Sequence, residues 1–463
     1  MRSTLEAAIR LPVYAPIFAA AAVIAEYGST YEPIEVLWRP LVVVVALVLL
    51  ITAVGRLITR DWHLPAFLAT LVVFAIVGLW EVLALASVAW LGLAWWSVRQ
   101  REGLLLTRRL AAPLTVWAAI WLIIATTSAI SSAIPRSIPP PESAVLNPAV
   151  DAPNIYMVLL DGYPRADSLL DYFGYDNEPF LAELGRRGFA VNPSSRSDYT
   201  TTFWTLPTML HMRSGDALGI FPWPEGPEGN RYVRELIDAA PALRSMEAAG
   251  YTTFSVGPAG SALVIRSAEH VRPTHWLSSF EVHLFQTGIL NAFATDFIYA
   301  EHRAGVLNTF TELERIAGDA PEPRFVFAHA SSPHAPIAFA ADGSPAEPAV
   351  CEPTCSNGAT TLAQLGVTLD ELSGPFSGQV EFLNDRVLAA VDSVISNDPD
   401  AVIVIFSDHG SRVDPADPEE SFRNLFAART PGRSDVFSDG DTPMSMFASL
   451  FNAYFDAGVV VER

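Results

Sequence analysis

Four long apolar blocks occupy the first 134 residues and set this part of the chain apart from the rest. They are Leu11–Tyr27, Leu41–Val54, Leu64–Trp96 and Leu110–Ile134. A membrane-spanning helix needs about 20 apolar residues, and the third block is long for one span and is interrupted by Glu81. We therefore expect two spans that meet in a tight turn near Glu81, which makes five membrane helices. The alternative is one long, tilted helix over this block, which makes four.

The arginines between the blocks favour five spans. Basic residues gather in cytoplasmic loops, and here they fall on alternate loops, whereas the loop between the first two blocks carries Glu32 and Glu35. With the Arg-rich loops inside, five spans place everything after Ile134 outside the cytoplasm. Arg39 is the one charge that fits this topology poorly. The Arg-rich loops contain Arg2 and Arg10, Arg56 and Arg60, and Arg99, Arg101, Arg108 and Arg109.

A proline-rich linker separates the membrane part from a second domain. Its six prolines, from Pro135 to Pro153, make a stiff spacer that cannot continue a helix. We place the transmembrane domain at 1–134, the linker at 135–153 and an extracytoplasmic domain at 154–463. No small-residue cleavage site follows the first apolar block, so we expect an anchor rather than a removed signal peptide.

Charge is distributed unevenly between these parts. Residues 1–134 hold nine Arg and seven acidic residues, whereas the remainder holds 20 Arg and 43 acidic residues, and the chain has no Lys. A domain this acidic, without a basic stripe, argues against a nucleic-acid partner.

The second domain opens with a short apolar run, Ile155–Leu160, that ends in Asp161. Such a run is typical of a buried strand in a parallel sheet. Ligands of open α/β sheets bind beyond the carboxyl ends of the strands, so a carboxylate at this point is well placed for chemistry. Taken alone, Asp161 is explained equally well as a turn residue before Gly162.

A second apolar strand, Arg324–Ala328, runs into His329, and His334 follows five residues later. Two histidines just past a strand end suggest a binding site, and a structural pair is the alternative.

The strongest strand pattern of the chain is Ala401–Phe406, which runs into Ser407, Asp408, His409 and Gly410. An Asp-His pair at the mouth of a buried strand is a metal-ligand arrangement, and the glycine allows close approach of the backbone. Two adjacent ionisable residues after so apolar a strand also need a compensating partner.

A run of hydroxyl side chains opens the stretch 197–215, whose later residues look helical. A helix N-terminus presents free N–H groups and a positive dipole end, which suits an anionic ester. The alternative is that one Thr caps the helix and the others have no role. The run contains Thr200, Thr201, Thr202 and Thr205.

Other apolar patterns predict helices over Glu178–Arg187, Tyr232–Ala249 and Gln379–Ser396, and a strand over Tyr251–Val256. The fold class is therefore an α-helical membrane domain followed by an α/β domain. Four further histidines lack ligand spacing, and we expect them to be surface or structural: His270, His275, His283 and His302.

The two cysteines, Cys351 and Cys355, lie in one loop-like stretch on the outer side. We expect a disulfide there, because the compartment is oxidising. A thiolate metal site would need further nitrogen or sulfur ligands nearby in the sequence, and none is present.

Together, Asp161, the Thr run, His334 and the Asp408-His409 pair resemble the alkaline phosphatase/sulfatase superfamily. The resemblance is closest to the membrane-anchored branch of phosphoethanolamine transferases and lipoteichoic-acid-type phosphoglycerol transferases. Proteins of that branch also have five N-terminal helices ahead of an extracytoplasmic sulfatase-like domain. The resemblance implies a mainly parallel sheet flanked by helices, and a sulfatase-like catalytic domain over 154–463.

The resemblance also implies roles for the site residues. The family's first acidic metal ligand falls on Asp161, and its later Asp-His pair falls on Asp408 and His409. Its substrate-side histidine matches His334, with His329 behind it. The implied cofactor is a divalent metal, zinc or manganese ahead of magnesium or calcium.

The nucleophile has two candidates. In phosphoethanolamine transferases the catalytic Thr stands five residues before a Pro, which here is Thr202 before Pro207. In sulfatases and nucleotide pyrophosphatases the nucleophile stands two residues before that Pro, which here is Thr205. We favour Thr202, which would also contact the metal, because the membrane architecture matches the transferase branch.

The chain departs from the sulfatases at two positions. Sulfatases convert a Cys or Ser two residues before this Pro to formylglycine, whereas this chain has Thr205 there and no Cys nearby. Sulfatases also tend to have a second Asp after the first, where this chain has Gly162. We therefore expect one metal site and no formylglycine chemistry.

The expected activity is transfer of a phospho-group from a membrane phospholipid to an envelope glycan or lipid, through a phospho-threonine, by a multi-pass plasma-membrane protein. The alternatives are a hydrolase of sulfate or phosphate esters and a metal-free membrane scaffold. Arg165 and Arg412 lie beside two of the ligand motifs, and they either bind the substrate's oxygens or form salt bridges.

Overall fold

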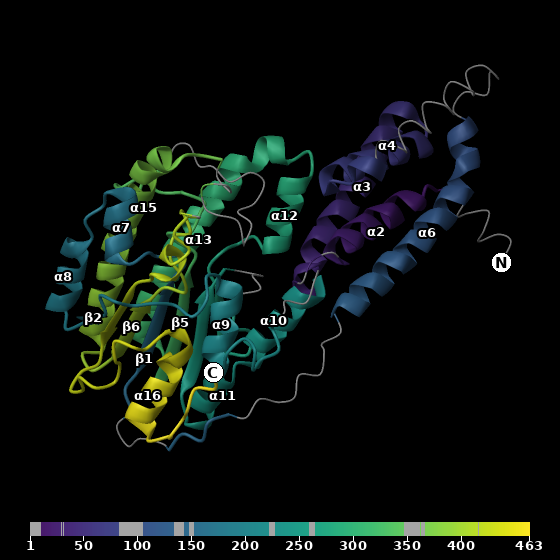
Figure 1. Ribbon diagram of the computed structural model, residues 1–463. Helices are drawn as coiled ribbons and strands as arrows, with labels where there is room; N and C mark the ends of the chain where they lie inside the picture. The colour runs from purple at the N-terminus through teal and green to yellow at the C-terminus, as the bar shows by residue number, and fades with distance from the viewer. Residues whose placement is uncertain are drawn as a thin grey trace. The chain divides into compact units, whose positions relative to one another are not determined.

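The computed structural model describes residues 11–28, 30, 32–82, 105–133, 143–147, 152–221, 227–258, 264–346, 362, 366–414 and 416–463 (Figure 1). Contacts divide the chain into two units. The first unit comprises Met1–Pro135 and Leu277–Asp296, and the second comprises Arg136–Trp276 and Phe297–Arg463. The boundaries predicted from the sequence did not anticipate that Leu277–Asp296 belongs to the first unit.

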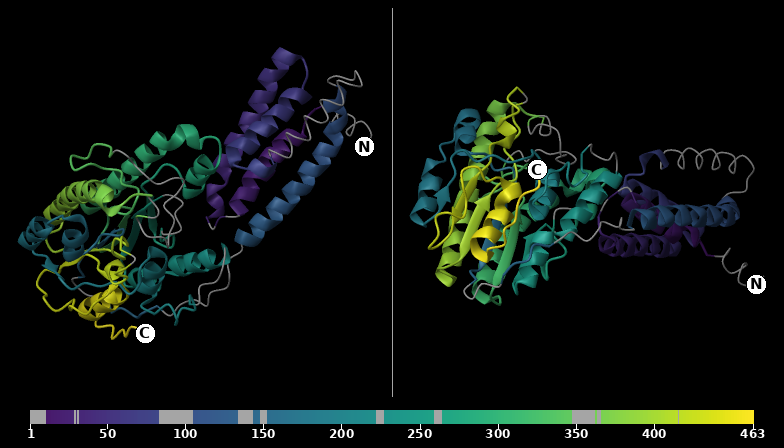
Figure 2. Two further views of the ribbon diagram at one scale, coloured as in Figure 1. Left: turned by 45° about the horizontal axis from the view of Figure 1, so that its top comes forward. Right: turned by 60° about the horizontal axis from the view of Figure 1, so that its bottom comes forward.

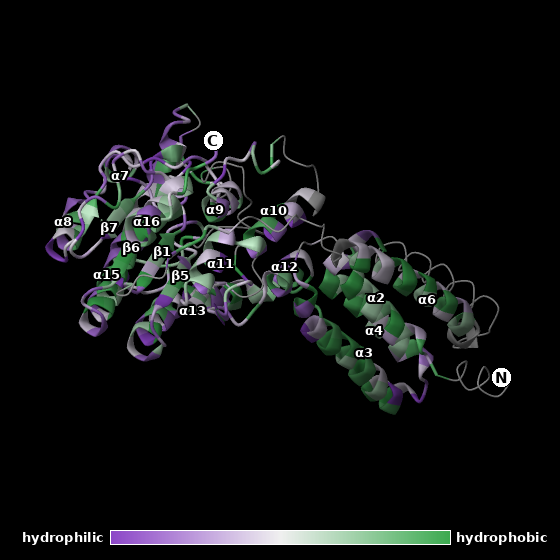
Figure 3. Cartoon of the chain, turned by 90° about the horizontal axis from the view of Figure 1, so that it is seen from below, coloured by the Kyte–Doolittle hydropathy of each residue, from purple (hydrophilic) through white to green (hydrophobic). Residues whose placement is uncertain are grey.

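The first unit is built from apolar helices. They are α2 (Tyr14–Gly28), α3 (Trp38–Thr59), α4 (His63–Val77) and α6 (Leu105–Ala133), with the short 3-10 helix η1 (Ile34–Val36) and the helix α12 (Ser279–Thr287). Hydrophobic residues predominate along α2, α3 and α4 (Figure 3). Within the described residues, two helical stretches are long and apolar enough to cross a membrane, Ile34–Thr59 and Leu110–Ser131.

Helix α3 shows why this unit suits a bilayer. Its buried residues include Val44, Val48 and Thr52, which repeat every four residues and form one narrow stripe toward the other helices. The remaining surface is apolar but exposed, and Leu57 and Ile58 are 81% and 79% exposed. A helix that is hydrophobic all round, with only one side against protein, suits an apolar surrounding medium.

Helix α4 ends at Val77, where Gly78 adopts a left-handed conformation with φ of 83°. This end precedes Glu81, where the sequence predicts a turn between two spans. The second of those predicted spans falls mainly on residues 83–96, which lie outside the described residues. Also outside them are Arg2, Arg10, Arg99 and Arg101, and the predicted disulfide partners Cys351 and Cys355.

The second unit contains a seven-stranded mixed sheet in the order β2-β7-β6-β1-β5-β3-β4. Strands β6, β1, β5, β3 and β4 are parallel to one another, and β7 is antiparallel to both of its neighbours, β6 and β2. The strands are β1 (Ile155–Leu160), β2 (Ala190–Val191), β3 (Thr252–Gly257), β4 (His270–Pro273), β5 (Arg324–Ala330), β6 (Val402–Phe406) and β7 (Phe426–Arg429).

Helices cover both faces of this sheet (Figures 1 and 2). The reason is visible in β1, whose successive side chains alternate between two cores: Tyr156 and Val158 belong to one, and Ile155 and Met157 to the other. The first core includes residues of α7 (Ala166–Phe173), α8 (Glu178–Arg186), α13 (Asn291–Asp319) and α15 (Leu369–Asn397). The second includes residues of α9 (Thr202–His211), α10 (Pro227–Ala239), α11 (Pro241–Ala248) and α16 (Met446–Phe455). The predicted α/β fold with helical flanks is therefore confirmed.

Two helix predictions need correction. The predicted helix Tyr232–Ala249 is two helices, α10 and α11, because Pro241 follows Ala240, whose φ is 31°. The helix predicted over Gln379–Ser396 begins ten residues earlier, at Leu369, after a capping box formed by Thr368 and Glu371. Two further 3-10 helices lie at Glu420–Phe422 (η2) and Pro443–Ser445 (η3).

Candidate metal centre

Three neighbouring parallel strands bring the predicted ligands together. In the order β5-β1-β6, Asp161 follows β1, the Asp408-His409 pair follows β6, and His329 is the penultimate residue of β5. The main chain links these ends, because the N–H of Asp161 donates to Ala330 O at 3.1 Å. The N–H of His334 in turn donates to Asp161 O at 2.9 Å.

The ligand atoms converge on the imidazole of His409. Its Nε2 lies 3.6 Å from Asp161 Oδ1 and 3.4 Å from Asp408 Oδ2. Ligand atoms of Asp161, His334 and His409 all lie within 4.8 Å of one another. These separations allow a single ion to bridge Asp161, His334 and His409, and Asp408 lies next to His409.

Hydrogen bonds leave these atoms available as ligands. His409 Nδ1 donates to the carbonyl of Gly410 at 2.7 Å, so its Nε2 carries the lone pair that faces the carboxylates. Asp408 uses its other oxygen, Oδ1, to accept from the N–H of Gly162 at 3.1 Å. Asp161 Oδ1 and Asp408 Oδ2 are buried and have no hydrogen-bond partner among the described residues.

Two buried carboxylate oxygens without partners carry a high desolvation cost unless a cation compensates them. Oxygen and imidazole nitrogen together suit a divalent ion such as zinc or manganese. The residues therefore fit the divalent metal that the sequence predicts.

The local electrostatics agree with this assignment. Burial alone would raise the pKa of the Asp161 carboxyl, but the imidazoles of His334, His329 and His409 outweigh burial and lower that pKa below its usual range. Burial lowers the pKa of His409, although the carboxylates of Asp408 and Asp161 oppose that change. Asp161 is thus ionised and His409 is neutral at neutral pH, which are the forms that bind metals.

The turn after His409 explains the predicted role of Gly410. A Cβ at this position would lie 2.3 Å from Glu420 O, so only glycine fits. The buried carboxylate of Glu420 accepts from the N–H groups of Ser411 at 3.0 Å and Val413 at 3.1 Å. Glu420 thereby shapes the loop that carries Arg412.

Arg412 is a buried cation beside the ligands, only 7% exposed. Its Nη2 donates to His334 Nε2 at 2.7 Å, while His334 Nδ1 donates to Ala335 O at 2.8 Å. Arg412 Nε and Nη1 are buried and have no partner among the described residues. The residue also has a left-handed φ of 55°, which is uncommon outside glycine. Strained backbone conformations of this kind cluster at functional sites.

Arg165 differs from Arg412. Its Nε and Nη2 donate to Asp167 at 2.8 and 2.6 Å, and its Nη1 donates to Ser195 O at 3.0 Å. For Arg165 the structure shows the salt bridge that the sequence left as the alternative to substrate binding. His329 is also engaged, because its Nε2 donates to Asp161 Oδ2 at 3.2 Å and so holds the carboxylate in place.

The two candidate nucleophiles occupy different positions on α9. Thr202 is its first residue, at a helix end whose first N–H groups have no partner within the helix. Thr205 lies one turn later, and its hydroxyl donates to Asp408 O at 3.1 Å. The hydroxyl of Thr205 is therefore committed to holding the ligand loop.

No protein-family model matches this chain, and no curated protein matches it. The solved structures give similarities of fold. The chain is similar to phosphoethanolamine transferases and sulfatases. The C-terminal periplasmic domain of EcEptC from Escherichia coli, in a complex with Zn, has 13% identity and a TM-score of 0.45 over 69% of this chain and 87% of that one.

Two further structures complete this comparison. The integral membrane protein lipooligosaccharide phosphoethanolamine transferase A from Neisseria meningitidis has 14% identity and a TM-score of 0.45 over 84% of this chain and 69% of that one. A 2-O GAG sulfatase has 12% identity and a TM-score of 0.44 over 67% of this chain and 72% of that one. These are the groups that the sequence motifs resemble.

Two of the histidines expected to be surface or structural, His275 and His302, lie beside each other. His275 and His302 have ring centroids 6.0 Å apart, and the Nε2 of His302 is buried without a partner among the described residues. Burial, followed by the charge of His329, lowers the pKa of His275 to about 4. Burial, followed by the charges of His275 and His334, lowers the pKa of His302 to about 3. These residues are 27 positions apart in the sequence, so no local spacing could have paired them.

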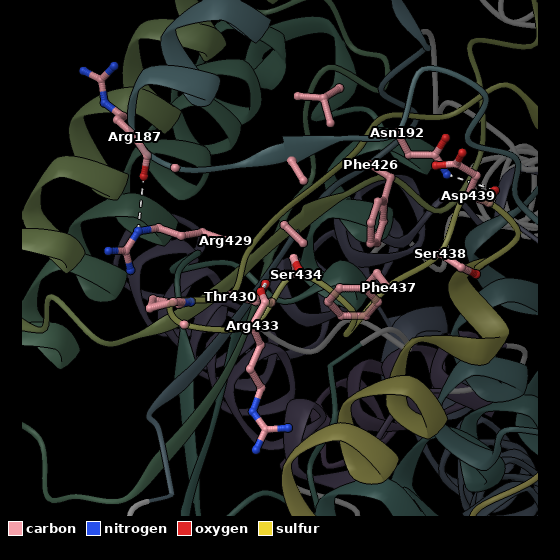
Figure 4. A pocket seen from close by; sticks show the side chains of 16 residues that line it. Arg187, Asn192, Phe426, Arg429, Thr430, Arg433, Ser434, Phe437, Ser438 and Asp439 are labelled. Carbon is pink, nitrogen blue, oxygen red and sulfur yellow. Dashed lines mark hydrogen bonds between the residues drawn. The ribbon is translucent and has the colours of Figure 1, made fainter.

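A cavity of about 400 Å³ lies at the β2–β7 edge of the sheet and contains none of the predicted site residues (Figure 4). Three arginines line it: Arg187, Arg429 and Arg433. Arg429 donates to the carbonyls of Arg187, Ala401 and Pro399, and Arg187 pairs with Asp392. Arg433 Nη1 donates to Ala453 O at 2.6 Å, so each of the three guanidinium groups is hydrogen-bonded to another part of the chain.

Proposed function

We propose that this chain is a membrane-anchored, metal-dependent transferase that moves a phospho-group from a phospholipid head group to an acceptor outside the cytoplasm. The observation that carries the proposal is the pair of unpartnered buried oxygens, Asp161 Oδ1 and Asp408 Oδ2, both directed at His409 Nε2. Arg412, with two unpartnered N–H groups, lies beside this cluster. Together they suit a divalent cation and an anionic ester bound side by side.

Asp161, Asp408 and His409 would hold the metal, with Thr202 beside it. When bound, a divalent metal supplies positive charge that favours ionisation of a nearby hydroxyl and offsets negative charge on a phosphoryl group. Thr202 Oγ1 would attack phosphorus, forming a phospho-threonine while the bond from phosphorus to the lipid's alcohol oxygen breaks. An acceptor hydroxyl would then attack the same phosphorus and release Thr202.

The chain's own groups would orient the phosphoryl oxygens. The free Nε and Nη1 of Arg412 provide two donors in a planar fork, which matches two oxygens of a phosphate. The first turn of α9 adds backbone N–H groups and the positive end of its dipole. His334 Nε2 accepts a hydrogen bond from Arg412, so His334 positions the guanidinium on the substrate side.

The choice of a lipid donor rests on the architecture of the chain. The helices α3 and α6 contain stretches long and apolar enough to cross a membrane, and α2 and α4 are shorter apolar helices. A catalytic unit carried by such helices works next to lipid head groups, whose concentration at the membrane surface is high. Phosphoethanolamine and phosphoglycerol are the head-group classes we favour.

The test uses the full chain in nanodiscs that contain phospholipids with an isotopically labelled head group. We expect a labelled phospho-group on the peptide that contains Thr202, and its loss in Thr202→Val but not in the matched variant Thr205→Val. With an acceptor present, the label should move to the acceptor. Release of the label only as a free phosphate ester would show a hydrolase, and an unlabelled chain that consumes no lipid would show a scaffold.

A further inference from the structure

The segment Leu277–Asp296 leaves the second unit and packs with the membrane helices of the first. It contains α12 and the first turns of α13, joined through Gly288 and Ile289. The chain therefore passes between the two units at three points, after Pro135, Trp276 and Asp296.

Helix α12 is fixed to α2 and α3 by polar and aromatic contacts. The Nε and Nη2 of Arg39 donate to the two carboxylate oxygens of Glu281 in a bidentate ion pair. His283 Nε2 lies 3.5 Å from Glu26 Oε2. Phe280 packs edge-on against Tyr27, with ring centroids 5.8 Å apart.

The following turn lies directly on the end of α4. The N–H of Ile289 donates to Ala75 O at 2.8 Å, so it satisfies one of the carbonyls that a helix end leaves open. A Cβ on Gly288 would lie 1.7 Å from Ile76 O, so the backbones meet here without room for a side chain. The indole N–H of Trp80 donates to Thr287 O at 3.2 Å.

These contacts all lie at one end of the helices of the first unit. They involve the C-terminal end of α2, the N-terminal end of α3 and the C-terminal end of α4, which is one end of an up-down helix bundle. Trp38 and Trp80 lie at the same helix ends and are 65% and 48% exposed. Tryptophan is enriched at membrane–water interfaces, so this level corresponds to the boundary between head groups and acyl chains.

The segment presents an apolar face at this level. Ile289 is 47% exposed and Phe293, four residues later, is 83% exposed. Phe293 lies in the first turn of α13, and Ile289 lies in the turn that directly precedes this helix. We propose that this face, formed by Ile289 and Phe293, inserts into the membrane leaflet at the head-group boundary as an additional anchor of the catalytic chain.

The lipid surface is the occupant that the observations favour. The face adjoins an apolar helix, because the N–H of Ile289 donates to Ala75 O of α4, and α4 itself exposes Leu68 and Val72. Amphipathic segments with Phe and Ile on one side lie in the interface with that side buried among acyl chains. The inference rests on the membrane anchoring in the proposed function and is independent of the proposed reaction.

The experiment places a single fluorescent label at Phe293→Cys in the full chain, in a background where Cys351 and Cys355 are Ser. The labelled protein is reconstituted in nanodiscs made with or without lipids brominated on the acyl chain near the head group. Leu57→Cys, 81% exposed on α3, is the lipid-facing control. Leu170→Cys, 56% exposed on α7, is the matched apolar control outside the first unit.

We expect brominated lipid to quench the label at Phe293 to an extent comparable with Leu57 and clearly greater than Leu170. If Phe293→Cys does not fold, Ile289→Cys tests the same face. Quenching at Leu57 with none at Phe293 or Ile289 would overturn the inference and leave membrane anchoring intact. A label whose emission is blue-shifted but not quenched, and only in discs that hold two chains, would overturn the inference. It would show that a second copy of the chain covers this face. No quenching at Leu57 would refute membrane anchoring, and this inference with it.

Discussion

Replacing Arg39 by Gln should release the segment Leu277–Asp296 from the helices of the first unit. The substitution removes a guanidinium that donates to both oxygens of Glu281. The carboxylate of Glu281 would keep the N–H and hydroxyl donors of Ser278, both at 2.9 Å, but would lose its only ion-pair partner among the described residues.

The expected cost follows from the exposure of the pair. The side chains of Arg39 and Glu281 are 30% and 10% exposed, so the pair lies between a surface pair and a buried one. Removing one partner of a buried pair costs about 3–5 kcal/mol, and an exposed pair contributes about 0–1 kcal/mol. We therefore expect about 2 kcal/mol, or about a 30-fold increase in local opening.

Hydrogen exchange of the full chain in nanodiscs measures this opening. The amide of Ile289, bonded to Ala75 O, reports the docked segment directly. Arg60→Gln removes the same charge from the opposite end of α3 and should leave this amide unchanged. The double variant Arg39→Gln/Glu281→Gln should exchange no faster than Arg39→Gln, because no unpaired charge remains. An Arg39→Gln variant whose Ile289 amide exchanges as in the wild type would refute the reasoning.

Three further outcomes are expected. Gly288→Val should free the Ile289 amide even with Arg39 present, because the added side chain collides with the α4 backbone; wild-type exchange would contradict that packing. Arg412→Lys should lower kcat/KM by roughly 10- to 100-fold while metal content is kept, because charge-assisted bonds are worth about 1.5–3 kcal/mol. The control Arg165→Lys should leave kcat/KM nearly unchanged. Equal effects of the two substitutions on kcat/KM would contradict the special role of Arg412. Cys351 and Cys355 should resist alkylation until the protein is reduced, and labelling of both in the native protein would show that no disulfide links them.

The metal centre was predictable because its residues lie at the ends of apolar strands. The runs before Asp161 and Asp408 are local patterns, and each carries its own polar end residue. That the strands are neighbours depends on the order β5-β1-β6, which no local pattern determines. The sequence could name the ligands, and only the sheet shows that they converge.

Other features depend on contacts between distant residues. Arg39 conflicted with the predicted topology, and its partner Glu281 is 242 positions away, so its pairing had no local signal. The roles of Arg165 and Arg412 were indistinguishable in the sequence. Only the structure shows that Arg165 forms an ion pair with Asp167, whereas Arg412 keeps two N–H groups without a partner among the described residues. The break at Pro241 did have a local signal, because a residue before proline disfavours the helical conformation.

Metal content measured together with turnover, in the full-length purified chain, tests the central claim most directly. The wild type should hold about one divalent ion per chain, as a single site of this kind requires. Asp408→Asn should lose most of that ion and all turnover, because one of two charged ligands is gone. Thr202→Val should keep the ion yet lose activity by several orders of magnitude. A wild-type chain without metal, or an Asp408→Asn variant with the wild-type content, would contradict the account.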